Sequence, residues 1–249
     1  MSATLARPRP VRGLLFLAVI YGGMAVVGLA YLPWAIRGRD GAFAASQAWC
    51  RLVRGAAHLI LGLKTEVRGS PPRGQVLVVG KHQSFLDIIL IFGALPRGRF
   101  IMKNELVRAP VLGWYALRMG CIPVDRGKRG QAVRKMLAEV ALGRLEPGQM
   151  IVYPQGTRVV PGVKAPYKTG TAALYQELGQ PCVPVACNVG LFWPKGALAL
   201  RPGRAVVEFL DPIPAGLASE DFMARLETAI ERESDRLMAE AGFPGTAAN

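Results

Sequence analysis

The chain has few of the residues that most often carry catalysis or hold metals. Its 249 residues include two histidines, and no C-x-x-C or G-x-S-x-G sequence occurs. The missing spacings argue against common zinc modules and against a serine-hydrolase nucleophile, so we expect no bound metal. The four cysteines lie in largely apolar stretches, which predicts buried, reduced thiols that act as small hydrophobic side chains. They are Cys50, Cys121, Cys182 and Cys187.

Acidic residues are also scarce beside basic ones. The 31 lysines and arginines against 17 aspartates and glutamates give a formal net charge of +14. Such chains usually meet nucleic acid, anionic lipid or phosphorylated substrates. Because the sequence shows no zinc-ligand spacing, no basic helix with heptads and no RNP pattern, we expect no nucleic-acid partner. With an apolar N-terminus beside the charge, anionic membrane lipids are the expected partner.

Residues 13–36 contain no charged side chain, and arginines lie on both sides of this run. The run is long enough to cross a ~30 Å hydrocarbon layer as a helix. It is too long for a cleaved signal peptide, and no clean cleavage site follows it. A single membrane span and a helix that dips into one leaflet and returns both stay open. Arginines on both sides favour the second slightly, and Gly22-Gly23 and Pro33 would let such a helix bend.

The next segment, Phe43 to Leu63, has apolar residues near helical spacing, interrupted by Arg51 and Arg54. This pattern is typical of a helix at a membrane surface. We therefore expect residues 1–68 to form a membrane-associated two-helix segment. The proline-rich stretch Ser70 to Gly74 would link it to a second domain, residues 69–249.

Short apolar runs alternate with helical patterns through this second part. This predicts the α/β class, with a mixed, mostly parallel sheet flanked by helices. The expected strands are 76–79, 100–102, 121–124, 150–153, 182–187 and 205–210. The expected helices are 86–95, 105–119, 131–145, 169–178 and 219–241.

His82 and Asp87 follow the first of these strands and are five residues apart. An imidazole titrates near pH ~6.5, which suits a base at neutral pH. On a regular helix this spacing would turn the two side chains about 140° apart, so a contact between them requires a tight turn between strand and helix. The spacing also fits a surface histidine with an aspartate near a helix start.

A second polar group follows the strand expected at 150–153. Gly156 permits unusual backbone torsions and a close approach to a ligand, Thr157 supplies a hydroxyl, and the planar fork of Arg158 suits a phosphate. Downstream, Lys168 and Gly170 lie at an expected helix start, where backbone N–H groups also favour anions. The alternative is a turn with solvated charges.

Together, these blocks resemble the glycerolipid acyltransferase family, specifically its bacterial 1-acyl-sn-glycerol-3-phosphate acyltransferases, over about residues 75–188. The N-H-x4-D block of that family is matched at 81–87, a block with a glycine and a downstream arginine at 120–126, F-P-E-G-T-R at 153–158, and an apolar strand with a central proline at 183–186. Lys81 replaces the usual asparagine and Gln155 the usual glutamate. Because glutamine can also donate hydrogen bonds, the second change bears on the acceptor preference.

The resemblance implies acyl transfer from acyl-CoA or acyl carrier protein to the sn-2 hydroxyl of lysophosphatidate. The product would be phosphatidate for phospholipid synthesis, and no cofactor would be needed. The enzyme would lie at the cell inner membrane with its active site facing the cytoplasm. Acyl transfer to another lysolipid, such as a lyso-ornithine lipid, stays open. A non-catalytic membrane-binding protein is the alternative from a different class.

The resemblance also assigns roles to individual residues. His82 would act as the general base and Asp87 would hold its ring. Arg158 would grip the substrate phosphate with help from Lys103 and Arg126. The remaining candidates are Gln155, Gly156 and Thr157 of the third block, with Lys168 and Gly170 in support.

Overall fold

One mixed sheet forms the centre of the fold. The computed structural model describes residues 5–124, 134, 138 and 147–243, and in them seven strands pair in the order β1-β7-β6-β2-β5-β3-β4. The strands are β1 Leu63–Arg68, β2 Val76–Gly80, β3 Gly98–Lys103, β4 Ile122–Val124, β5 Gln149–Val152, β6 Cys182–Cys187 and β7 Gly203–Phe209. Neighbouring strands are parallel except for the antiparallel pair β6 and β7. The predicted mixed, mostly parallel sheet is confirmed.

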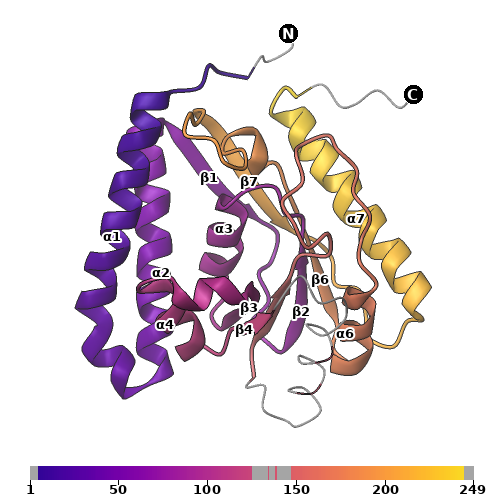
Figure 1. Ribbon diagram of the computed structural model, residues 1–249. Coiled ribbons are helices and arrows are strands. Elements are labelled where there is room, and N and C mark those ends of the chain that lie inside the picture. The colour runs from indigo at the N-terminus through magenta and orange to yellow at the C-terminus, as the bar shows by residue number, and fades with distance from the viewer. Residues whose placement is uncertain (1–4, 125–133, 135–137, 139–146, 244–249) are drawn as a thin grey trace.

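Helices cover both faces of this sheet (Figure 1). The longer ones are α1 Pro10–Arg37, α2 Arg39–Ala56, α3 Leu86–Ala94, α4 Leu112–Arg118, α6 Gly170–Leu178 and α7 Ser219–Glu240. Shorter turns are the π-helical Ala57–Leu61 and the 3₁₀ segments Asn104–Arg108 and Val189–Leu191. Helices α1 to α4 lie on one side of the sheet, and α6 and α7 on the other (Figure 1).

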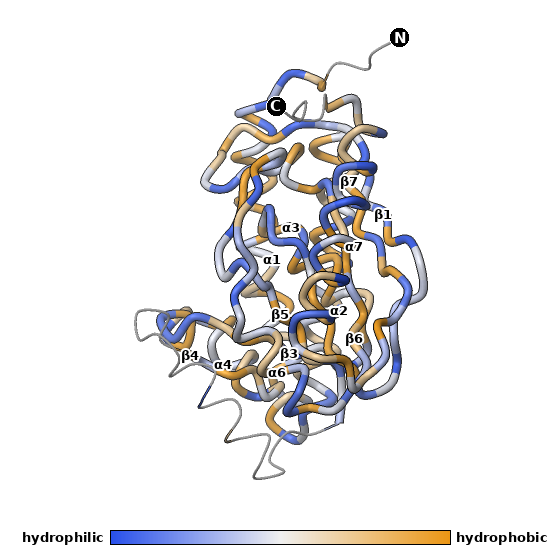
Figure 2. The backbone as a smooth tube through the Cα atoms, turned by 90° about the vertical axis from the view of Figure 1, so that its right-hand side faces the viewer, coloured by the Kyte–Doolittle hydropathy of each residue, from blue (hydrophilic) through white to orange (hydrophobic). Residues whose placement is uncertain are grey.

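Strand β2 shows why the sheet needs both layers. Val76 and Val78 pack into a core shared with α2 and α3, whereas Leu77 and Val79 pack into a core shared with α6 and α7. A strand buried on both faces reads as a continuous apolar run, as this one does. Seen from the side of α7, hydrophobic segments lie in the middle of the molecule near β5 and β6 (Figure 2). His82 lies two residues beyond the end of β2, and therefore at the middle of the edge of the sheet where β2 ends.

Helices α1 and α2 form an antiparallel hairpin that turns at Gly38 (Figure 1). Helix α1 continues through Gly22-Gly23 and Pro33, where the sequence would have allowed a bend, and the chain reverses only at the extended Gly38. In the described part of the chain, α1 is the one helix long and apolar enough to cross a membrane. Much of its apolar surface is uncovered: the exposed residues include Val11, Leu14, Leu15, Tyr21, Val26, Leu29, Trp34 and Ile36.

Hydrogen bonds fasten α1 to the rest of the molecule along its length. Three side chains from other helices donate to its carbonyls: Trp49 to Ile20 at 2.8 Å, Tyr115 to Gly28 at 2.6 Å, and Arg118 to Ala35 and Ile36 at 3.1 and 2.8 Å. The carbonyls of Ile20 and Gly28 lie inside the helix, so these bonds use a second lone pair, whereas those of Ala35 and Ile36 lie in the last turn, where carbonyls lack a partner within the helix. The hairpin is thereby held to the helical layer beside the sheet.

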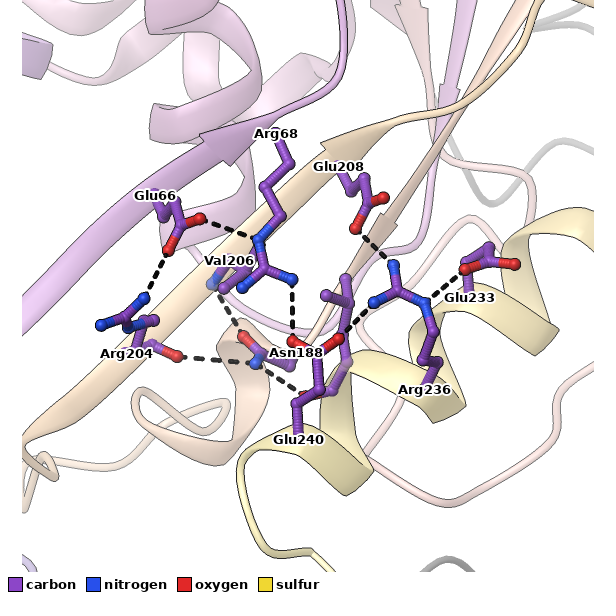
Figure 3. A network of polar contacts seen from close by, with 10 residues as sticks. Glu66, Arg68, Asn188, Arg204, Val206, Glu208, Glu233, Arg236 and Glu240 are labelled. Carbon is purple, nitrogen blue, oxygen red and sulfur yellow. Dashed lines mark hydrogen bonds and ion pairs between the residues drawn. The ribbon is translucent and has the colours of Figure 1, made fainter.

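Helix α7 is fastened to the opposite side by a polar network (Figure 3). Its ion pairs join Arg68 to Glu240 and Glu66, Arg204 to Glu66, and Arg236 to Glu208, Glu233 and Glu240. Two buried bonds add to this network, one from the Cys187 N–H to Ser234 Oγ at 3.2 Å and one from Asn188 Nδ2 to the Leu237 carbonyl at 3.0 Å. Helix α7 is therefore a fixed support for whatever its side chains hold.

Two helix predictions were wrong in extent. The helix expected at 105–119 is broken, because Pro110 has no amide hydrogen and disfavours a helical conformation at Ala109, which is extended. Val111 then has a positive φ of 62° before α4 begins. The helix expected from Phe43 to Leu63 ends earlier, in a π turn closed by the left-handed Gly62.

Strand β1, which follows Gly62, was not predicted. It pairs with β7 as an edge strand of the central sheet. It lies before the predicted domain boundary at 68/69, so residues 63–68 share a sheet with the second part of the chain. The division at 68/69 itself stays a prediction. The helix expected at 131–145 lies outside the described residues, apart from positions 134 and 138.

Candidate active site

The turn between β2 and α3 brings His82 and Asp87 together. His82 Nδ1 lies 2.9 Å from Asp87 Oδ1. The other carboxylate oxygen accepts the backbone N–H groups of Gln83 at 2.8 Å and Ser84 at 2.6 Å. Helix α3 begins at Leu86, so Asp87 lies in its first turn and reaches back over the loop. The tight turn that the spacing requires is present.

The His82 ring is held on more than one side. It stacks on the ring of Tyr153, with centroids 4.1 Å apart and planes 21° apart. Its carbonyl accepts the Val159 N–H at 2.8 Å, which joins the two predicted motif loops. Since a carboxylate oxygen can only accept, Nδ1 donates in this contact and the lone pair of the neutral ring lies on Nε2. The ring is therefore arranged to accept a proton at Nε2.

An apolar cavity of about 160 Å³ opens beside the imidazole. Its walls come from α2, α3, β3, α4 and the loop after β5. Trp49, Phe85, Phe100 and Met119 line it together with His82, and Lys103 lies at its edge. Helix α2 thus contributes to a wall of the site although it belongs to the predicted membrane segment.

Tyr153 is half-buried between His82 and Phe100, and its hydroxyl is enclosed. Its ring centroid lies 6.3 Å from that of Phe100, with nearly parallel planes. In the described part of the chain its hydroxyl has no hydrogen-bond partner. Burial, and then the negative charge of Asp87, raise the pKa of Tyr153 well above its ordinary value. The phenol therefore stays neutral beside the imidazole.

The second motif loop places cations around Gly156. This glycine has a φ of +69°, and a side-chain methyl here would come within 2.6 Å of Lys168 Nζ. Lys168 is exposed and Arg158 is partly exposed, and neither pairs with a carboxylate among the described residues. Gly170 begins α6 directly after this group. The structure therefore gathers Gly156, Lys168 and the start of α6, with Arg158 on the same loop.

The other predicted site residues are less closely grouped. Lys103 pairs with Glu105 at 3.0 Å on the surface. Arg126 lies outside the described residues. Thr157 is exposed, and the Gly156 N–H donates to the Tyr153 carbonyl at 3.0 Å. Because this amide is engaged, an oxyanion donor in this loop would have to come from the next residues.

A carboxylate on α7, that of Glu231, contacts both motif loops. This residue was not predicted from the sequence. Glu231 contacts Lys81 Nζ through both oxygens at 2.6 Å, and its Oε1 accepts from Tyr167 Oη at 2.9 Å and from Gln155 Nε2 at 3.4 Å. Burial, followed by the charge of Glu231, raises the pKa of Tyr167 well above its ordinary value. Lys81 and Glu231 are 150 residues apart, so no local spacing announces the pair.

The cysteines do not offer a nucleophile. All four are buried and free, which confirms the prediction of buried, reduced side chains. Burial raises the pKa of Cys50 to about 12 and that of Cys121 to about 11, although both line the cavity. A thiol protonated at neutral pH is unreactive. No cluster of three metal-binding side chains occurs among the residues that the structure describes.

This arrangement defines a class of protein. A histidine held by an aspartate, beside an apolar cavity and a cationic loop, can deprotonate a hydroxyl next to an anionic group and an aliphatic chain. The family model described as acyltransferase matches residues 64–188, and this chain belongs to the acyltransferase family.

Particular relatives narrow the class. The chain is 28% identical to the 1-acyl-sn-glycerol-3-phosphate acyltransferase of Pseudomonas aeruginosa, covering 90% of this chain and 86% of that protein. It is 33% identical to the bovine 1-acyl-sn-glycerol-3-phosphate acyltransferase alpha, covering 85% and 71%. The crystal structure of the 1-acyl-sn-glycerophosphate acyltransferase PlsC from Thermotoga maritima shares the fold, with a TM-score of 0.76, 24% identity and coverage of 92% and 97%.

Proposed function

We propose that this chain transfers a fatty acyl group from a thioester to the sn-2 hydroxyl of 1-acyl-sn-glycerol-3-phosphate, giving phosphatidate. The observation that carries the proposal is the buried contact of His82 with Asp87 at the wall of an apolar cavity. The names of the relatives support the same substrate and reaction. Phospholipid synthesis is the corresponding role.

His82 acts as the general base. An alcohol is a poor nucleophile at neutral pH, so Nε2 takes the hydroxyl proton as the oxygen attacks the thioester carbonyl. Asp87 fixes the tautomer and stabilises the imidazolium that forms. The new C–O bond replaces the C–S bond, and the proton passes from Nε2 to the leaving thiolate. A positioned base of this kind contributes roughly 10²–10⁴ in rate.

The acyl chain and the phosphate bind on different sides of the imidazole. The cavity lined by Trp49 and Phe100 offers an apolar surface for an aliphatic chain. Arg158 is the first candidate for the phosphate, because its fork suits phosphate oxygens and no carboxylate among the described residues occupies it. Lys168 and the start of α6 support it, and Lys103 and Arg126 are further candidates.

The membrane is where the acceptor lies. The exposed apolar face of α1, flanked by arginines, supports binding to an anionic leaflet. Coenzyme A and carrier-protein thioesters are water-soluble donors made in the cytoplasm, so the active site faces the cytoplasm at the inner membrane. Whether α1 spans the bilayer or lies in one leaflet does not change the proposed chemistry.

A thiol-release assay tests the function directly. Purified protein in detergent receives acyl-CoA or acyl carrier protein thioester, with and without lysophosphatidate. We expect acceptor-dependent release of thiol, and its near loss in His82→Ala while lysophosphatidate binding stays measurable. Competition with lyso-ornithine lipid distinguishes the alternative acceptor. If no pair of donor and acceptor releases thiol, the chain is a membrane-binding protein without this activity.

A further inference from the structure

Glu231 contacts three side chains, and each of them belongs to the residue directly before a predicted site residue. Lys81 directly precedes His82, Gln155 directly precedes Gly156, and Tyr167 directly precedes Lys168. Their donor atoms lie 2.6 Å, 3.4 Å and 2.9 Å from Glu231 Oε1. A single carboxylate oxygen therefore contacts the neighbour of the base and the neighbours of two residues of the cationic loop.

These contacts lie where displacement is difficult. The Lys81 side chain is 3% exposed and that of Glu231 is 20% exposed. A buried ammonium needs a partner, because burial of an unpaired charge is strongly unfavourable. Helix α7 is itself held at Ser234 and Leu237, one and two turns further along, by bonds from the end of β6. Glu231 therefore lies on a fixed support.

Lys81 and Gln155 are also two of the positions at which this chain departs from the family blocks, and Tyr153 is a third. In the structure Lys81 and Gln155 both contact Glu231, so these two departures are coupled through one side chain. A glutamate at 155 would place a second carboxylate against Glu231, with one ammonium between them. Like charges in a partly buried site disfavour joint ionisation. The neutral Gln155 avoids this conflict.

We propose that Glu231 is a positioning residue, which sets the spacing between the base His82 and the cationic loop at Gly156 through its contacts with Lys81, Gln155 and Tyr167. It touches no reacting atom. It supplies from α7 a negative charge beside position 155, where this chain carries a neutral glutamine. The proposal deepens the proposed function and rests on it for the turnover readout.

The experiment moves this charge between the two positions. Glu231→Gln removes the carboxylate, Gln155→Glu adds a second one, and the double variant carries one carboxylate at 155 facing an amide at 231. We expect each single variant to lower kcat about tenfold or more, since a small displacement of reacting groups has large kinetic effects. The double variant should recover to within about threefold of the native kcat. Glu227→Gln, one turn earlier on α7 and exposed, is the matched control and should leave kcat unchanged.

Several results would overturn the proposal. They are a native kcat in Glu231→Gln, a double variant no more active than Gln155→Glu, or an equal loss in Glu227→Gln. If Glu231→Gln does not fold, the comparison of Gln155→Glu with the double variant decides. Lysophosphatidate binding and thermal unfolding are measured on every variant. Non-additive effects of the substitutions at 155 and 231 on binding and unfolding can be measured even if the native chain releases no thiol. Failure of the proposed function can therefore be distinguished from failure of this inference.

Discussion

Replacement of Asp87 by asparagine tests the proposed chemistry most directly. Asp87 is fully buried and accepts three hydrogen bonds, from His82 Nδ1 and from two backbone N–H groups. In Asp87→Asn the amide oxygen can still accept from Gln83 and Ser84. The amide nitrogen then faces His82 Nδ1 and donates to it. The ring proton is thereby forced onto Nε2, the atom that has to accept the substrate proton.

The expected loss of kcat follows from this change of the tautomer of His82. A base in the wrong tautomer loses up to about 10⁴ in kcat, which corresponds to about 5 kcal/mol of transition-state stabilisation. The KM for lysophosphatidate should change little, because the buried Asp87 does not touch the acceptor. The free energy of unfolding should fall by about 1–2 kcal/mol, because neutral hydrogen bonds replace charged ones.

Initial rates of thiol release at saturating acceptor measure kcat, and thermal unfolding confirms that the variant is folded. Asp221→Asn is the matched control, since it makes the same change in the first turn of α7 at an exposed position. Asp221→Asn should leave kcat and the thermal unfolding temperature unchanged. A folded Asp87→Asn protein with more than about a tenth of the native kcat would refute the assignment of His82 and Asp87 as base and orienting acid.

Three further predictions concern the loop and the thiols. Arg158→Ala should raise the KM for lysophosphatidate roughly tenfold to a hundredfold, because that factor corresponds to the free energy of a hydrogen bond to a charged group. The KM for the acyl donor should change less, and an unchanged KM for lysophosphatidate would exclude Arg158 from the phosphate site. Gly156→Ala should lower both stability and turnover, because the backbone here is left-handed and a methyl group would collide with Lys168. Gly179→Ala is the control, since Gly179 is also left-handed but has open space around it, and it should lower stability alone. Equal turnover in the two variants would contradict this prediction. Cys50→Ala and Cys121→Ala should keep native kcat in thiol-release assays, because burial raises their pKa values; loss of turnover in a folded variant would revive a cysteine nucleophile.

The sequence was most informative where the signal is local. Strand β6 was predicted with its observed bounds, and β2 within one residue, because both are short apolar runs buried on both faces. The turn holding His82 and Asp87 was predicted only on condition that the two side chains meet, because a regular helix would turn them apart. The same spacing also fitted a surface histidine, and the structure shows the contact. The break at Pro110 was available as a signal, but the apolar pattern on both sides of it outweighed it.

The missed features depend on distant partners. The alternation in β1 was masked by the helical pattern that precedes it, and only its pairing with β7 makes it a strand. Glu231 appears in the sequence as one more acid on an amphipathic helix. Its importance comes from Lys81 and Gln155, which the chain brings to it across the sheet from about 150 and 76 positions away.

The bonds that other helices donate to the carbonyls of α1 have a consequence for how deep the enzyme works. Trp49, one of these donors, also lines the cavity beside the imidazole. Under the proposed binding to a leaflet, the depth of α1 among the lipids therefore fixes the depth of His82. The glycerol hydroxyl of the acceptor has to reach His82 at that depth, so the structure of the protein determines where in the leaflet the reaction takes place.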